Sequence, residues 1–284
     1  MNGWILINKP SGITSNQVLS TLKRNGFPKK IGHVGTLDPL ACGVLPIAFG
    51  KATKTISLLE KSFKTYEFTT QFGSTTDTLD VDGTITNSCS HIPSKKEIEV
   101  AIKSFIGTQE QTPPIYSAIR ISGKRAYDLA RKNQDITMPT RVVTINKLEL
   151  LEYEPSRCSF EVECSSGTYV RAIARDIAIK CSSLGFVTAL KRTKLANITI
   201  DMCDNLSQAI SSPRIYFPNE IFPDIPVINI EKSFKQKILN GNSVLVPSKE
   251  LLNSEQLCFA SIDDQLVALG KITGSTFHPL KLLI

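Results

Sequence analysis

The sequence predicts an α+β protein with a small β-rich domain at the end of the chain. Strand-like and helix-like segments alternate through residues 1–212, and two hairpin-like pairs among them argue against a parallel doubly wound sheet. Prolines dot residues 213–226, which is typical of a linker. Short apolar runs in residues 227–284 indicate strands. We therefore expect a main domain, a linker and a small domain over these three ranges.

The first elements follow from apolar patterns and turn residues. Residues 3–8 predict a strand that ends at a Lys-Pro-Ser-Gly turn. Thr14 or Ser15 can cap a helix that ends near Gly26. A glycine-rich loop is expected from residue 31 to about residue 43.

The middle of the chain adds further strands and helices. Residues 64–72 and 157–164 alternate apolar and polar side chains, as half-buried strands do. Asp82-Gly83 has the composition of a hairpin turn. Helices are expected after a capping box that begins at Ser94 and again from Val170 onward.

The tail combines one short helix with strands. Apolar residues around Phe234 have helical spacing, and Gly241 ends that pattern. Apolar runs at residues 243–246, 257–262 and 266–272 predict strands.

Composition and charge narrow the class of protein. A formal charge of +7 and a pI near 9.0 suit a polyanionic partner, although many basic proteins have none. The cysteines are scattered without a Cys-x-x-Cys pair and the histidines lie far apart, so we expect neither a disulfide framework nor a metal site. We find no long apolar run and no signal peptide, and we expect a cytoplasmic protein without a membrane span.

One carboxylate lies in the glycine-rich loop. Asp38 precedes Pro39, and this pair commonly initiates a turn, so the residue has an ordinary structural explanation. The alternative is a carboxylate on a loop whose glycines let the backbone approach a ligand closely. Spacing alone leaves both explanations open.

Residues 33–46 read His-Val-Gly-Thr-Leu-Asp-Pro-Leu-Ala-Cys-Gly-Val-Leu-Pro, and this run resembles the catalytic motif of the bacterial tRNA pseudouridine synthase B (TruB) family. The similarity continues, in the family's order, through its Lys-Pro motif, its tyrosine strand with the following hairpin, its RNA-gripping insertion and two later motifs. These matches fall at residues 3–15, 64–66, 73–83, 111–120, 123–127, 164–171 and 190–193. They cover the chain from residue 3 to about residue 195.

The resemblance implies a pseudouridine synthase fold, in which a mixed, largely antiparallel sheet is flanked by helices. It also implies isomerisation of uridine to pseudouridine at position 55 in the T-loop of tRNA. In this reaction the base is flipped out, and its glycosidic bond is cleaved and re-formed without a cofactor. Asp38 is the residue that the reaction requires, and the resemblance leaves open whether it attacks C1′ or abstracts the 2′ proton.

Further site residues follow from the matched motifs. Arg171 is expected to pair with Asp38, and the alternative is a solvated helical arginine. Tyr66 is expected to stack on the target base and to relay its C5 proton, although by itself it would be interpreted as a core aromatic residue. The remaining expected substrate contacts, each with an ordinary core or surface alternative, are His33, Tyr169, Leu190 and Lys9.

Basic residues of the insertion over 112–140 are expected to grip T-arm phosphates, and the alternative is a solvated face. They are Arg120, Lys124, Arg125, Arg131 and Lys132. The last apolar runs of the tail resemble the closing strands of the small PUA-type RNA-binding domain, with an unrelated small β-domain as the alternative. We expect tRNA as the partner, bound at its T-arm and elbow, and a monomer without an obligate protein partner.

Two rival functions need to be weighed. Residues 49–53 hint at a phosphate loop, but the P-loop pattern requires a glycine where Leu45 stands and Ser or Thr where Ala52 stands. A non-catalytic tRNA-binding or tRNA-folding protein on the same scaffold would be expected to lack Asp38 or Arg171, and both are present.

Overall fold

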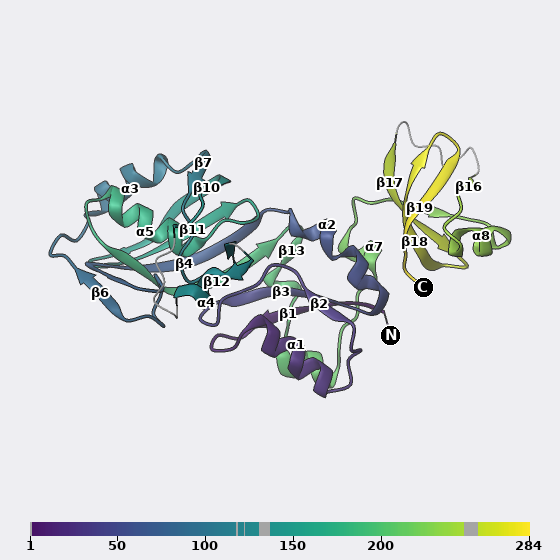
Figure 1. The fold of residues 1–284 in the computed structure, drawn as a ribbon, viewed down its shortest axis with the longest axis horizontal. Helices are drawn as coiled ribbons and strands as arrows, with labels where there is room; N and C mark the ends of the chain where they lie inside the picture. Colours follow the sequence, from purple (N-terminus) through teal and green to yellow (C-terminus); the bar gives the residue numbers. More distant parts are fainter. Residues whose placement is uncertain (1, 118, 122, 131–136, 247–254) are drawn as a thin grey trace.

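The computed structural model describes residues 2–117, 119–121, 123–130, 137–246 and 255–284. A ten-stranded sheet forms most of the molecule, and a five-stranded sheet lies near the C-terminus (Figure 1). The strands of the large sheet are β1 (Gly3–Lys9), β2 (Ile31–His33), β3 (Cys42–Phe49), β4 (Lys64–Phe72), β7 (Gly107–Gln111), β10 (Arg141–Glu154), β11 (Arg157–Cys164), β12 (Gly185–Leu195), β13 (Ile198–Thr199) and β14 (Asp204–Asn205).

The large sheet is mixed and mainly antiparallel. Its order is β14-β1-β3-β12-β4-β11-β10-β7, with β2 paired to β3 and β13 paired to β12. Only the pairs β1–β14 and β3–β12 are parallel among the described strands of this sheet. The predicted mixed, largely antiparallel sheet is therefore confirmed.

Helices cover this sheet at its two ends (Figure 1). Thr14 and Ser94 each open a helix with a reciprocal capping box, which satisfies backbone N–H groups of the first turn. The helices are α1 (Ser15–Arg24), α2 (Ile56–Glu60), α3 (Lys95–Lys103), α4 (Ala126–Ala130), α5 (Val170–Lys180), α6 (Leu206–Ser211) and α7 (Pro218–Ile221), with 3-10 turns η1 (Gly50–Thr55) and η2 (Ile200–Met202). The helices predicted near residues 14, 94 and 170 are confirmed.

The core between α3, α5 and the sheet fixes the position of β4. Phe68 of β4 stacks on Phe160 of β11, with ring centroids 5.1 Å apart. Ile173 and Ile177 of α5 and Ile98 of α3 are buried in the same cluster. Burying such side chains is the main stabilising term, about 1.5–3 kcal/mol for each, so β4 has little freedom to move.

The second sheet has the order β15-β17-β18-β19-β16. Its elements are β15 (Val227–Asn229), β16 (Val244–Leu245), β17 (Gln256–Ile262), β18 (Gln265–Thr273) and β19 (Thr276–Leu282), with η3 (Lys232–Phe234) and α8 (Lys235–Leu239). The helix and strands predicted for the tail are therefore present.

The two sheets are joined through residues 213–226. Trp4 and Tyr216 exchange two backbone hydrogen bonds of 2.8 Å. Phe222, just after α7, lies 6.0 Å from the ring of Trp4 and 6.3 Å from that of Phe259 in β17. This segment therefore packs against both sheets, which the prolines in its sequence do not reveal.

Two local predictions were wrong. The loop expected from 31 to 43 begins as β2 and ends as the first residues of β3. The hairpin joins β5 (Ser74–Thr76) to β6 (Ile85–Ser88) through residues 77–84, which is a longer connection than an Asp82-Gly83 turn. Strand β3 is buried almost throughout, so it lacks the polar alternation that reveals a strand.

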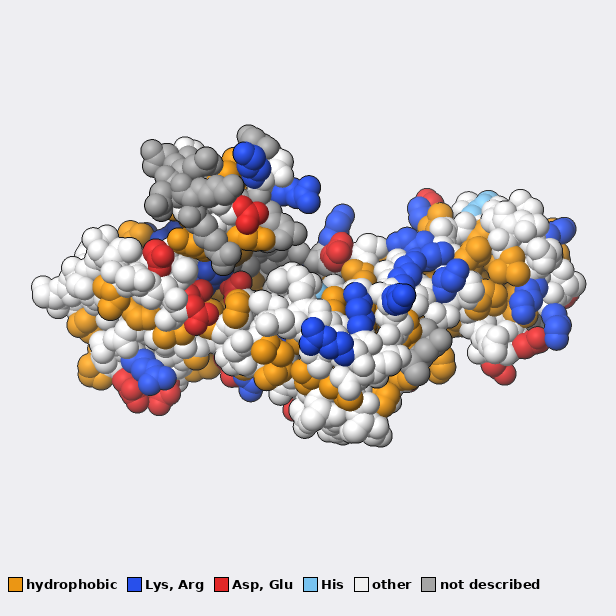
Figure 2. Space-filling model, turned by 60° about the horizontal axis from the view of Figure 1, so that its bottom comes forward, with side chains coloured by type: hydrophobic (Ala, Val, Ile, Leu, Met, Phe, Trp, Pro, Cys, Tyr) orange, Lys and Arg blue, Asp and Glu red, His pale blue; other side chains and the backbone are white. Residues whose placement is uncertain are grey.

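The surface is unevenly charged. Figure 2 shows lysine and arginine side chains gathered along one face, from the middle of the molecule toward the C-terminal sheet. Within the described ranges, no helix combines the length and apolar character needed to cross a bilayer.

Gly43→Ala is expected to destabilise the fold more than Gly26→Ala. Both glycines have positive φ, 104° and 90°. A Cβ on Gly43 would lie 2.2 Å from the carbonyl oxygen of Arg192, whereas a Cβ on Gly26 would meet nothing within 4 Å. We expect the free energy of unfolding, measured with denaturant, to fall by about 1–3 kcal/mol more in Gly43→Ala. Equal losses would contradict the close approach of β3 and β12.

Candidate active site

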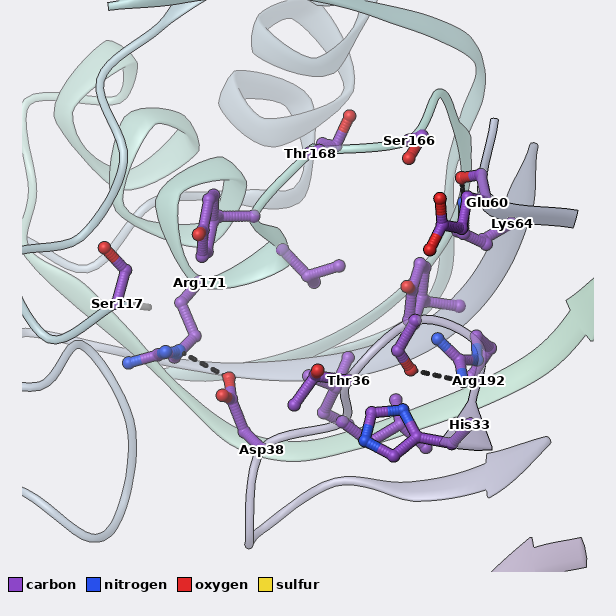
Figure 3. Close-up of a pocket in the computed structure, with 17 residues that line it drawn as sticks. His33, Thr36, Asp38, Glu60, Lys64, Ser117, Ser166, Thr168, Arg171 and Arg192 are labelled. Carbon is purple, nitrogen blue, oxygen red and sulfur yellow. Dashed lines mark hydrogen bonds and ion pairs between the residues drawn. The ribbon is translucent and has the colours of Figure 1, made fainter. Parts of the chain in front are cut away.

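Arg171 joins three segments that are far apart in the sequence. Its Nε lies 2.9 Å from Oδ2 of Asp38 (Figure 3). Its Nη1 lies 3.2 Å from Oδ2 of Asp80. Nη1 also donates to the carbonyl of Thr78 at 2.7 Å, and Nη2 donates to the carbonyl of Tyr116 at 3.1 Å. The Nε–H bond is not aligned as a hydrogen bond, so its contact with Asp38 is an ion pair. The expected pairing of Arg171 with Asp38 is present.

The two carboxylates that pair with Arg171 have different environments. The Asp80 side chain is 7 % exposed, whereas that of Asp38 is 36 % exposed. Burial raises the pKa of Asp80, although the Thr78 hydroxyl and the Arg171 guanidinium oppose this rise. Asp80 therefore lies behind Arg171 in the protein, and Asp38 lies in front of it with access to solvent.

The loop that carries Asp38 is held by the Lys-Pro segment at the start of the chain. Gly12 N–H donates to the carbonyl of Pro39 at 2.8 Å, and the hydroxyl of Ser11 donates to the carbonyl of Leu40 at 2.8 Å. A local turn, from Ala41 N–H to the carbonyl of Asp38 at 3.1 Å, closes the loop itself. Asp38 is thus both a turn former and an accessible carboxylate, so the two explanations of its sequence position are compatible.

Asp38 and Arg171 form one end of a cavity of about 640 Å³. This volume is in the usual range for sites that bind small ligands. Of the residues expected at the site, six line the cavity: His33, Asp38, Tyr66, Tyr169, Arg171 and Leu190. Glu60, Lys64 and Arg192 lie at the end away from Asp38, where Arg192 is next to His33 (Figure 3).

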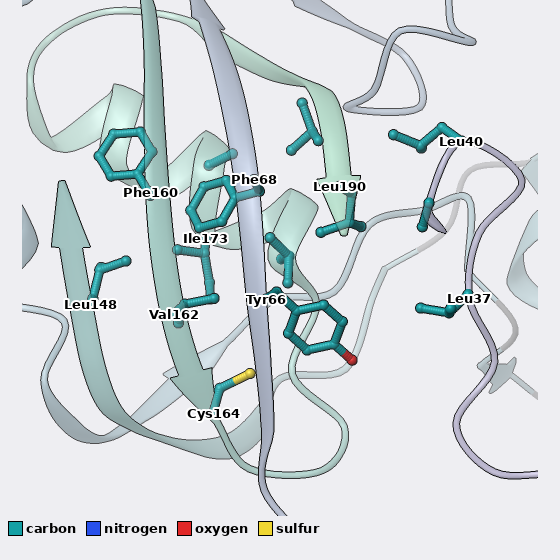
Figure 4. Close-up of a cluster of buried hydrophobic side chains, with 14 of the residues drawn as sticks. Leu37, Leu40, Tyr66, Phe68, Leu148, Phe160, Val162, Cys164, Ile173 and Leu190 are labelled. Atoms are coloured by element: carbon teal, nitrogen blue, oxygen red, sulfur yellow. The ribbon is translucent and has the colours of Figure 1, made fainter. Parts of the chain in front are cut away.

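Tyr66 belongs to the core and to the cavity at once. It is 9 % exposed and packs in the same cluster as Phe68, with its hydroxyl directed away from Phe68 (Figure 4). Burial raises the pKa of Tyr66, and the nearby guanidinium of Arg192 opposes that rise. The hydroxyl is therefore protonated at neutral pH, and the ring presents a fixed surface to the cavity.

The other cavity residues are fixed by their own elements. Tyr169 precedes α5, and its backbone N–H and carbonyl bond the Gln111 side chain at 2.8 and 3.2 Å. Burial, followed by the charge of Arg192, lowers the pKa of His33, whose buried Nδ1 has no hydrogen-bond partner. The imidazole is therefore neutral at neutral pH.

Several expected site residues lie outside the cavity. Lys9 is fully buried below the Asp38 loop, and its ammonium donates to the carbonyls of Pro10, Ile13 and Pro39. Arg120 and Lys124 are exposed on the short hairpin β8 (Arg120–Ile121) and β9 (Lys124–Arg125), where Arg125 pairs with Arg120 through its backbone. Arg131 and Lys132 fall outside the described residues.

The polar residues at the site that were not predicted include Asp80, Lys64 and Arg192. Each lies inside a segment that matches a family motif, and this match was the signal that could have identified it. None of them has a distinctive spacing of its own. Lys64 is buried and donates to the carbonyls of Glu60 and Ser62 at 3.0 and 2.7 Å. Burial, followed by the charge of Arg192, lowers its pKa to about 8.

The described residues include no group of three or more His, Cys, Asp or Glu side chains that could hold a metal ion. The cavity brings together an accessible carboxylate, a paired guanidinium and a buried phenol.

Asp80→Asn is expected to change how stability depends on pH. Because the pKa of Asp80 is raised above 3.8 in the folded state, folded Asp80 binds its proton more readily than unfolded Asp80. Its contribution to the free energy of unfolding is therefore greatest at low pH and is lost as pH rises through the interval above 3.8. The free energy of unfolding of wild type minus that of Asp80→Asn, measured with denaturant from pH 3 to pH 7, should fall with rising pH.

Asp82→Asn is the matched control, because Asp82 is exposed and carries the same charge in the same loop. A wild-type-minus-Asp80→Asn difference that rises with pH would show that Asp80 is stabilised as an anion, contrary to the burial of its carboxylate.

Comparison with known proteins agrees with this geometry. A model of the TruB family pseudouridylate synthase (N terminal domain) matches residues 23–170. The tRNA pseudouridine synthase B of Caulobacter vibrioides is 35% identical over 296 residues, which cover 99% of this chain and 96% of that protein. The tRNA pseudouridine synthase B of Zymomonas mobilis is 36% identical, with coverage of 99% and 95%.

Solved structures show the same fold. A Cbf5-Nop10-Gar1 complex contains a chain that superimposes with a TM-score of 0.71 at 22% identity, covering 99% of this chain and 85% of that one. An H/ACA RNP bound to a substrate RNA gives a TM-score of 0.72 at 20% identity, with the same coverage. The family model covers more than half of the chain, and the two tRNA pseudouridine synthase B relatives, 35% and 36% identical, each cover 99% of it. The chain therefore belongs to the TruB family of pseudouridylate synthases.

Proposed function

We propose that this protein isomerises uridine to pseudouridine at position 55 in the T-loop of tRNA. The observation that carries the proposal is the ion pair of 2.9 Å between Arg171 and the accessible carboxylate of Asp38, at the end of a cavity that also contains Tyr66. Relatives about one-third identical over nearly the full chain are named tRNA pseudouridine synthase B. A non-catalytic tRNA-binding protein would have no need for this pair.

Each site residue has a role in the proposed reaction. The guanidinium of Arg171 holds the carboxylate of Asp38 at 2.9 Å, and this carboxylate acts at the target ribose either on C1′ or on the 2′ proton. Asp80 holds Arg171 from behind, so the guanidinium keeps its orientation if Asp38 moves toward the sugar. Tyr66 stacks on the base, and its protonated hydroxyl can take part in moving the C5 proton. These steps need no cofactor.

The target base must leave the T-loop to reach Asp38, which costs roughly a few kcal/mol of lost stacking and pairing. The cavity walls from Tyr66, Tyr169 and Leu190 offer aromatic and apolar contacts that offset this cost. Neutral His33 lies at the cavity wall and is proposed to contact the RNA where the base has left.

We also propose how the tRNA is held. Arg120 and Lys124 are exposed and separate from the cavity, so they are available for T-arm phosphates, and Arg125, Arg131 and Lys132 are proposed to act with them. The basic face in Figure 2 runs toward the C-terminal sheet, which we propose to be a PUA-like RNA-binding domain over 227–284, following a catalytic domain over 1–212. We also propose that the protein acts as a monomer without an obligate protein partner. A tRNA substrate implies a cytoplasmic location.

Asp38→Asn is expected to abolish pseudouridine formation without loss of RNA binding, because the amide cannot act as nucleophile or base. The measurement is pseudouridine mapping on an unmodified tRNA transcript and on an isolated T-arm hairpin, with filter binding of each RNA. Asp82→Asn removes the same charge from an exposed position and should leave the rate unchanged.

Three outcomes would contradict the proposal. Wild-type protein that leaves both RNAs unmodified, or that modifies a position outside the T-loop, would overturn the assigned reaction or its site. Full activity of Asp38→Asn would overturn the assigned role of Asp38.

Activity on the full tRNA but not on the hairpin is compatible with the proposed reaction. It would show that the elbow, and not only the T-arm, is required.

A further inference from the structure

Arg192 is fully buried at the far end of the cavity from Asp38. Its strand β12 pairs with β4 at Tyr66 and with β3 at Gly43. The guanidinium donates from Nε to the carbonyl of Val44 at 2.7 Å, and from Nη2 to the carbonyls of Val34 and Gly35 at 3.2 and 2.8 Å. It therefore holds the backbone that leads from β2 into the Asp38 loop.

This cation has no carboxylate partner among the described residues. None of the ion pairs among the described residues includes Arg192, whereas Arg171 forms two of them. Carbonyl dipoles satisfy hydrogen bonds but do not cancel a full charge, and a buried unpaired charge is costly to fold around. The two arginines of the cavity therefore differ: the charge of Arg171 is neutralised, and that of Arg192 is not.

The charge of Arg192 acts on the cavity. Burial is the largest cause of the lowered pKa values of His33 and Lys64, and the charge of Arg192 lowers both further. The same charge opposes the rise in the pKa of Tyr66 that burial causes. Lys64 adds a second cation at this end, with the carboxylate of Glu60 near it. Electrostatic effects are strong here because the surroundings are poorly solvated.

The proposed reaction creates an anion that would benefit from this charge. When the N1–C1′ bond breaks, its electron pair leaves with N1, and the detached uracil carries a negative charge spread over its ring and carbonyl oxygens. The C5–C1′ bond then forms, the proton on C5 is lost and N1 gains a proton, so atoms and charge balance. The anion arises whether Asp38 bonds to C1′ or removes the 2′ proton.

We propose that Arg192 is an electrostatic positioning residue that stabilises the detached uracil anion. Tyr66 lines the same cavity, and Arg192 lies at the end away from Asp38 (Figure 3). A ribose at Asp38 would therefore extend its base into the cavity toward Arg192. Arg192 acts through space and through the backbone it holds, since its own surface is fully covered. The inference rests on the proposed function, because only cleavage of a nucleoside generates this anion.

Changing the stability of the detached uracil anion distinguishes this electrostatic role from a structural role. Fluorine at C5 withdraws electrons and stabilises the detached base without help from the protein. The experiment compares T-arm hairpins with uridine or 5-fluorouridine at the target position, under single-turnover conditions, and follows loss of the target nucleoside. The variants are Arg192→Met, Arg192→Lys and Lys194→Met. Lys194 is exposed on the same strand and serves as the control for lost charge.

We expect Arg192→Met to react about 10²-fold more slowly with uridine, and to be much less impaired with 5-fluorouridine. Arg192→Lys should recover most of the rate, and Lys194→Met should match wild type. If Arg192→Met does not fold, as judged by circular dichroism, Arg192→Gln supplies the neutral side chain.

Equal slowing of Arg192→Met on both hairpins would overturn the inference, because a purely structural defect does not depend on the leaving group. An unimpaired Arg192→Met would overturn it as well. Wild-type protein that modifies neither the uridine hairpin nor the full tRNA transcript would instead overturn the proposed function, and this inference with it.

Discussion

The site depends on a guanidinium that is held between two carboxylates, of which only one can reach a substrate. Arg171 is buried in the first turn of α5, and it touches Asp38 in front, Asp80 behind and two backbone carbonyls at its sides. Pairing reduces the cost of burying this charge, and the loops that bring its partners are fixed by the same interaction. The loop over 36–41, the connection over 77–84 and the segment before Ser117 therefore meet at one point.

The rest of the large sheet can be understood as support for that point. Strand β4 carries Tyr66 and is held by the stack of Phe68 on Phe160. Strand β12 carries Leu190 and Arg192, and it lies between β3 and β4, so it contacts both the Asp38 side and the Tyr66 side of the cavity. The Lys-Pro segment before α1 binds the Asp38 loop from below through backbone hydrogen bonds. A rigid sheet and a braced loop keep the carboxylate and the aromatic platform at a fixed separation, as a reaction between positioned groups requires.

Much of this arrangement could be predicted from sequence, and the failures have physical reasons. The helices after Thr14 and Ser94 have capping boxes, and β4 and β11 alternate apolar and polar residues, so these elements are visible locally. Strand β3 is buried on both faces and β10 contains register shifts, so neither shows a clean alternation. Asp38, Tyr66 and Arg171 were recognisable only through matched motifs. Lys9 matched a motif equally well, yet its ammonium is buried among backbone carbonyls below the loop. Sequence similarity could not predict this position, because it does not say on which side of a loop a side chain lies.

A structure of Asp38→Asn bound to a T-arm hairpin would show whether this cavity receives the nucleotide. We expect the target uridine to be flipped out of the RNA loop, with C1′ of its ribose beside residue 38, its base stacked on Tyr66 and the base edge directed toward Arg192. A uridine that stays stacked within the RNA, or a base bound outside the cavity, would contradict the role assigned to the pair of Asp38 and Arg171.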